Sequence, residues 1–133
     1  NYVRRCHALL GWTAETGRVW DVSAAVAWLR DQAPSSVPVE VAGKGPAGII
    51  AAYSALFQPH IAGVILDDVP ATHEQPEAPQ FLNVLRICDI PDVLGMIAPR
   101  PLTVLEGTPA LCDGVKAAYT AAGKTEQLTI KAK

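Results

Sequence analysis

Three glycines in the stretch VAGKGPAG, at 41–48, have the spacing of a turn that binds phosphate. Gly43, Gly45 and Gly48 form the pattern G-x-G-x-x-G between an apolar run and a second apolar segment. Glycines at this spacing allow the backbone to approach a pyrophosphate when the turn joins a strand to a helix. Asp67 and Asp68 end the next apolar run, where such a site places the carboxylate that binds a ribose. These residues predict a dinucleotide site for FAD or NAD.

A second group of polar side chains follows the same run. Asp67, Asp68, His73 and Glu74 lie near the carboxyl end of a predicted strand, where α/β sheets bind ligands. Carboxylates and a histidine can bind a metal, but one histidine in a loop is a weak ligand set. We therefore expect a solvated loop and no metal site, and keep Asp67, Asp68 and His73 as candidates for binding a ligand.

Composition limits the classes of function. The 133 residues are 50% hydrophobic and 18% charged, which is typical of one folded domain over 1–133. A net charge of −2 argues against nucleic-acid and acidic-membrane partners, because such surfaces attract an excess of Lys and Arg. The cysteines are odd in number and far apart, so they indicate neither a disulfide framework nor a metal half-site; they are Cys6, Cys88 and Cys112.

Strands and helices alternate along the chain. Asp21 is a candidate N-cap for the first helix, Pro91 is expected to break a helical stretch, and Gly123 to close the last helix. The alternation predicts an α/β fold, a three-layer sandwich with a mainly parallel sheet of about four strands. The expected elements are helix 21–31, strand 37–42, helix 46–58, strand 61–68, two short helices in 81–98, strand 101–107, helix 112–122 and strand 127–130.

This order of elements resembles the C-terminal half of an α/β-hydrolase of the acetyl xylan esterase and dienelactone hydrolase type. The resemblance covers most of the chain and is clearest in IAPRPLTVLEG, at 97–107, which reads as a helix end followed by a strand. It implies a partial α/β-hydrolase fold, with 1–133 as the C-terminal part of a larger domain. The other stretches that carry it are YVRRCHALLGWTAETGRVWDVSAAVAWL, IAGVILDDVPATH and FLNVLRICDIPDVLGMIAPRPLTVLEG.

The resemblance also implies where the catalytic residues of this family would lie. The nucleophile belongs in a G-x-S-x-G turn between a strand and a helix, and here Gly45 stands at the serine position, with Ala47 in place of the last glycine. Asp113 is the only carboxylate in the expected acid loop, and we expect it to begin a helix instead. None of the histidines follows the last strand, where the base belongs; they are His7, His60 and His73.

We therefore expect a pseudoenzyme that has lost its catalytic serine and needs no cofactor. Its turn could instead hold a carbohydrate or acyl ligand, since helix N-terminal amides face such a site. The dinucleotide domain remains the alternative, and the hydrolase interpretation is preferred because it covers most of the chain rather than a six-residue motif. The residues expected around a ligand are Gly43, Lys44, Gly45, Pro46 and Ala47.

A partial hydrolase sheet would leave one edge and one apolar face uncovered. The open edge would lie beside residues 37–42, and exposed edges and large apolar faces favour association. We therefore expect the chain to pair with another chain, with a further copy, or with the rest of its own domain. The family resemblance implies a bacterial protein and is compatible with a secreted or periplasmic location, whereas the sequence itself indicates no compartment.

Overall fold

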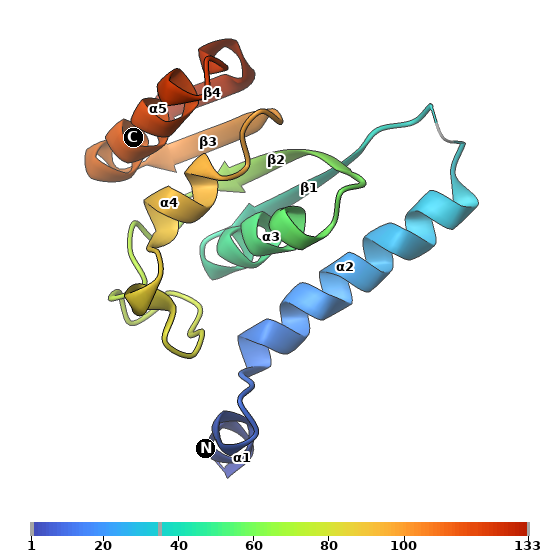
Figure 1. Ribbon diagram of the computed structural model, residues 1–133, viewed down its shortest axis with the longest axis vertical. Helices are drawn as coiled ribbons and strands as arrows, with labels where there is room; N and C mark the ends of the chain where they lie inside the picture. Colours follow the sequence, from blue (N-terminus) through green and yellow to red (C-terminus); the bar gives the residue numbers. More distant parts are fainter. Residues whose placement is uncertain (1, 35, 133) are drawn as a thin grey trace.

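The computed structural model describes residues 2–34 and 36–132 and shows alternating helices and strands (Figure 1). No helix within these residues is both long and apolar enough to cross a bilayer. In chain order the elements are α1 (Tyr2–Leu9), α2 (Ala14–Gln32), β1 (Val39–Lys44), α3 (Pro46–Phe57), β2 (Ile61–Asp67), the 3-10 helix η1 (Val84–Arg86), α4 (Ile90–Gly95), β3 (Leu102–Gly107), α5 (Pro109–Ala121), the 3-10 helix η2 (Thr125–Gln127) and β4 (Leu128–Ala132).

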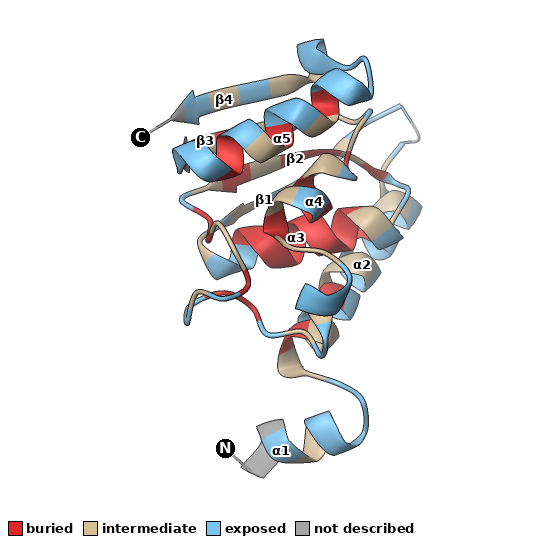
Figure 2. Ribbon diagram, turned by 60° about the vertical axis from the view of Figure 1, so that its left-hand side comes forward, coloured by how far each residue is buried: buried red, intermediate tan, exposed pale blue. Residues whose placement is uncertain are grey.

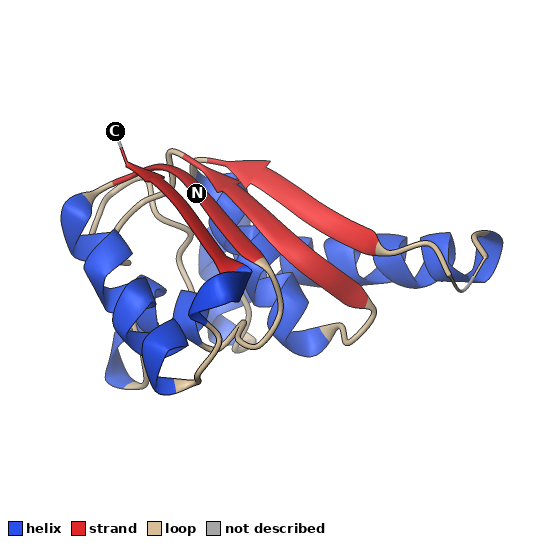
Figure 3. Cartoon of the chain, turned by 90° about the horizontal axis from the view of Figure 1, so that it is seen from above, coloured by secondary structure: helices blue, strands red, loops and turns tan. Residues whose placement is uncertain are grey.

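The four strands form one parallel sheet in the order β1-β2-β3-β4. Each crossover advances in the same direction across the sheet, so right-handed connections place all of their helices on one face. Figure 3 shows this arrangement, with the helices gathered on one side of the strands. The predicted α/β fold with a four-stranded parallel sheet is confirmed. The described residues supply two layers, the sheet and one layer of helices.

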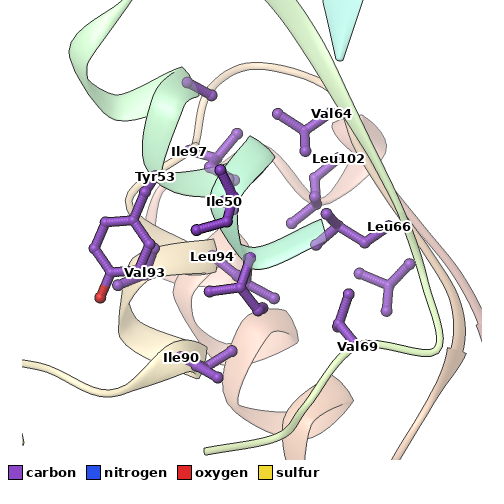
Figure 4. Packing of buried hydrophobic residues seen from close by; sticks show 14 of the residues in the cluster. Ile50, Tyr53, Val64, Leu66, Val69, Ile90, Val93, Leu94, Ile97 and Leu102 are labelled. Atoms are coloured by element: carbon purple, nitrogen blue, oxygen red, sulfur yellow. The ribbon is translucent and has the colours of Figure 1, made fainter. Parts of the chain in front are cut away.

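The core lies between the sheet and α3, α4 and α5 (Figures 2 and 4). Helix α3 is buried continuously over residues 48–55, as its uniformly apolar sequence predicts. Ile61, Val64 and Leu66 of β2 are at most 2% exposed. In contrast, the inward side chains of β1 remain half-buried, as Val41 shows. The core is therefore less completely covered at the β1 edge than at its centre.

Helix α2 starts earlier than predicted. Thr13 is its N-cap, and the Thr13 hydroxyl accepts a hydrogen bond from the Thr16 N–H at 3.0 Å. Asp21 lies inside the helix, so its prediction as the N-cap was wrong. Thr13 satisfies one of the unpaired amides of the first turn. The helix could therefore begin at Ala14, before the apolar spacing from which its start was predicted.

The structure confirms the predicted helices around Pro91 and Asp113 but corrects the place that each residue has in its helix. Pro91 lies in the first turn of α4, where a missing N–H breaks no helical hydrogen bond, so it does not interrupt a helix. Helix α5 begins after the N-cap Thr108, which places Asp113 within the helix rather than at its start. Gly123 has a φ of +64° directly after the helix end, which confirms its expected capping position.

Candidate functional site

A one-residue turn joins β1 to α3. Gly45 stands alone between the two elements and has φ 54° and ψ −135°, a conformation that favours glycine. Its N–H donates to the Asp67 carbonyl at 2.8 Å, and its carbonyl accepts from the Gly48 N–H at 3.0 Å. These bonds hold the turn between β1, β2 and the first turn of α3.

The three glycines of the motif have different spatial requirements. A Cβ atom on Gly43 would lie 2.6 Å from the Gly48 Cα, and one on Gly48 would lie 2.5 Å from a methyl carbon of Val69. A Cβ on Gly45 would meet nothing within 4 Å. Gly43 and Gly48 therefore permit close packing of helix against strand, whereas Gly45 is required by its backbone angle and has open space above it.

The structure brings two of the candidate side chains into contact. Lys44 and Asp67 are in register on β1 and β2, and the Lys44 Nζ lies 2.9 Å from an oxygen of Asp67. This hydrogen bond and the charge of Asp67 raise the pKa of Lys44. Asp68 is exposed with a φ of 47°, and its N–H donates to the Leu105 carbonyl. The carboxylate expected to bind a ribose is thus paired with a lysine.

A cavity of about 790 Å³ lies beside the turn. Lys44, Pro46 and Ala47 line it, whereas Gly43 and Gly45 do not. The wall contributed by α2 was not predicted, because no spacing pattern in the sequence links that helix to a turn so far along the chain. The lining residues are Glu15, Arg18, Asp21, Val22, Val41, Ala42, Lys44, Pro46, Ala47, Ile50, Ala51, Pro76, Glu77, Ala78, Pro79 and Gln80.

His73 is buried and does not line this cavity. Its Nε2 lies 2.9 Å from the Tyr53 hydroxyl and its Nδ1 lies 3.0 Å from the Pro79 carbonyl. A carbonyl only accepts, so Nδ1 carries the proton and Nε2 accepts from Tyr53. Burial lowers the pKa of His73, which favours this neutral form. The expectation of a solvated loop was therefore wrong at His73, although Glu74 is exposed.

The other acidic and basic groups do not gather at the turn. Asp113 is exposed on α5, 3.8 Å from Lys116. His60 directly precedes β2, at the end of the sheet opposite to Gly45. Within residues 2–34 and 36–132, no three His, Cys, Asp or Glu side chains are grouped as a metal site would require.

Comparison with known proteins shows that the fold of this chain is similar to part of a solved structure. No family model and no curated protein matches the sequence. Among solved structures, the chain is similar to a Bacteroides fragilis protein provisionally assigned as an acetyl xylan esterase, with a TM-score of 0.69 and 19% identity. The alignment covers 99% of this chain and 39% of that protein. The chain therefore has an α/β fold that matches part of a hydrolase-like protein and spans well under half of its length.

Proposed function

We propose that this chain is a non-catalytic α/β-hydrolase-like module in which Gly45 occupies the position of the nucleophilic serine. One observation carries the proposal: Gly45 is the only residue between β1 and α3, and it has a positive φ with open space above it. α/β-Hydrolases place their serine on a strained strand-to-helix turn of this kind. The likeness to part of a provisionally assigned acetyl xylan esterase supports the comparison.

The chemistry at the turn supports a loss of catalysis. Glycine has no side chain to attack an ester, and removal of the serine from a hydrolase triad lowers kcat by about 10⁶-fold. Among the described residues, His73 uses both ring nitrogens in hydrogen bonds, and His60 lies at the opposite end of β2. Neither histidine is placed to activate a nucleophile at Gly45.

The remaining role that we propose is structural. The helices cover one face of the sheet and β1 is an edge strand, so the module can complete a larger sheet or pack against another domain. Binding of a carbohydrate or acyl ligand over the turn stays a prediction, with Lys44, Pro46 and Ala47 as its contacts. Equilibrium dialysis with xylotriose and with acetate tests that prediction directly.

A dinucleotide-binding domain is the second candidate, favoured by the glycine turn between a strand and a helix and by Asp67 at the end of β2. We rank it lower because dinucleotides bind where the strand order reverses, and within the described residues the order runs from β1 to β4 without reversal. Titration with NAD and with FAD, followed by tryptophan fluorescence, tests it. Binding that Gly45→Val abolishes would promote this candidate over the hydrolase-like module.

Ester hydrolysis tests the preferred function. The purified chain is incubated with 4-nitrophenyl acetate, and its rate is compared with that of the heat-denatured chain, which retains the same nucleophilic side chains without their geometry. We expect equal rates. A folded chain that turns over ester many times per molecule would contradict the proposal, and retention of that rate in Gly45→Val would show that the reaction proceeds elsewhere on the surface.

A further inference from the structure

Helix α1 stands apart from the rest of the fold. Figure 1 shows it beyond the lower end of α2, away from the sheet and from α3, α4 and α5. Among the described residues, α1 makes at most slight contacts with other helices and strands. A helix of eight residues is marginal in water without tertiary contacts. In this arrangement α1 therefore needs a packing surface that its own chain does not supply.

A capping motif fixes the direction in which α1 leaves α2. Gly11 follows the end of α1 with a φ of 78°. Its N–H donates to the Ala8 carbonyl at 3.2 Å, and the Trp12 N–H donates to the His7 carbonyl at 2.9 Å. These are the two bonds of a Schellman motif, in which glycine takes the left-handed position after a helix. Only Trp12 separates this motif from Thr13, the N-cap of α2, so the corner holds residues 2–12 outward as an arm.

The arm has an apolar face that the described chain leaves open to solvent. Cys6, Leu9 and Leu10 have the spacing i, i+3, i+4 and so share one side of the helix. Leu9 is 88% exposed and Leu10 is 73% exposed. Trp12, which follows the helix, is 53% exposed. A helix with such a face is typical of one that lies in an apolar groove.

A groove of the matching kind lies on the outer side of the helical layer. It is bounded by α2, α3, α4 and the segment around η1. Trp20 and Met96 in its walls are 64% and 57% exposed. Its α2 wall runs from Thr16 to Ser23, about 12 Å at the rise of an α-helix, and the eight residues of α1 have the same length. The groove can therefore hold α1 along its full length.

We propose that this groove receives the arm of a second copy of the chain. The fixed corner points the arm away from its own groove, and a two-fold dimer places each arm in the groove of the other copy. At on the order of 100 Å² for each large exposed apolar side chain, arm and groove together reach about 800 Å² per partner, the size of a stable interface. These side chains are Leu9, Leu10, Trp12, Trp20, Phe57, Leu82, Ile87 and Met96.

Sedimentation of the full chain from micromolar to millimolar concentration tests the dimer. We expect a dissociation constant on the order of 100 μM, because a short arm forms a weak contact, so the groove is open in the dilute monomer. Leu9→Gln on the arm and Ile87→Gln in the groove should each weaken the dimer by about tenfold or more, since each occurs twice in it. Leu29→Gln is the matched control, because this exposed leucine of α2 lies outside both surfaces.

Paramagnetic labelling identifies the copy that supplies the arm. A nitroxide is attached at Ala8→Cys, on the side of α1 away from Cys6 and Leu10, in a chain whose half-exposed cysteines are replaced by serine. This chain is mixed with a ¹⁵N-labelled chain that carries no nitroxide. At concentrations that form the dimer, we expect broadening of the Phe57 and Ile87 amide signals in the ¹⁵N-labelled copy.

Several outcomes would overturn the arm exchange. They are a monomer at millimolar concentration, a dimer that Leu9→Gln and Ile87→Gln leave as tight as the wild type, and broadening confined to α1, which would show that arms pair with each other. Broadening of the groove signals within a dilute chain that carries both labels would show that the arm folds into its own groove. The arm and groove contain no residue of the turn at Gly45, so this proposal does not rest on the proposed function, and ester turnover would leave it standing.

Discussion

The backbones of Gly43 and Gly48 are packed so closely that neither position has room for a methyl group. A Cβ on Gly43 would lie 2.6 Å from both the Cα and the N of Gly48, and these are backbone atoms that cannot rotate away. The contact joins the end of β1 to the first turn of α3 and so fixes the turn at Gly45 between them.

Gly43→Ala should therefore destabilise the fold, because the added methyl forces the strand and helix apart. We expect a loss of about 1–3 kcal/mol in the free energy of unfolding, the usual cost of overpacking. Gly17→Ala is the matched control, since a Cβ there meets nothing within 4 Å on helix α2. It should stabilise by about 0.5–1 kcal/mol through helix propensity. Urea denaturation measures both, and a neutral Gly43→Ala would refute the close contact.

The pH dependence of stability should carry a contribution from His73. Its pKa is lowered in the folded chain by burial, so below about pH 6.5 the unfolded chain binds a proton that the folded chain does not. The contribution of His73 to the free energy of unfolding is therefore fully present above pH 6.5, and it decreases as the pH falls below that value. Denaturation of the wild type at pH 7.5 and pH 5.5 measures the decrease.

Variants assign that decrease to one residue. His73→Gln should show a smaller loss of stability between the two pH values, and His60→Gln, which changes an exposed histidine, should keep the wild-type loss. Asp89 also contacts His73: burial acts to raise the pKa of Asp89, but hydrogen bonds from Thr72, His73 and Ile90 lower it. Its contribution is lost only below about pH 4. An unchanged pH slope in His73→Gln would contradict the assignment.

The outer side of the helical layer should bind an apolar dye. A groove of about 690 Å³ lies between α2, α3, α4 and the segment around η1, and among the described residues no charged side chain lines it. Phe57 and Ile87 in its walls are 72% and 85% exposed. We expect the folded chain to enhance the fluorescence of anilinonaphthalene sulfonate, because this dye binds exposed hydrophobic surface.

Polar substitutions locate the dye. Phe57→Gln and Ile87→Gln should each reduce the fluorescence while changing the free energy of unfolding by no more than about 0.5 kcal/mol, as is usual for exposed positions. Leu9→Gln alters an equally exposed side chain on α1, outside the groove, and should leave the fluorescence unchanged. Dye binding that only Leu9→Gln reduces would show that the groove is not the binding surface.

The sequence predicts local features well and tertiary ones poorly. The β1–α3 turn lies where Gly45 and Pro46 predict it, because glycine and proline restrict the backbone regardless of distant contacts. The burial of His73 depends on Tyr53 of α3 and on the fold of its own loop, in which Pro79 accepts its hydrogen bond, and neither contact leaves a periodic signal. The α2 wall of the cavity was missed for the same reason, since packing of α2 on α3 decides which of its side chains reach the turn.

Covalent labelling tests the central claim most directly. The folded chain is treated with a fluorophosphonate, which reacts with activated serines of hydrolases, and the intact mass is recorded. An absent nucleophile at Gly45 predicts an unmodified mass, while an active serine esterase in the same tube is fully modified. Stoichiometric labelling of the folded chain, lost on denaturation, would show an activated nucleophile and contradict the non-catalytic module.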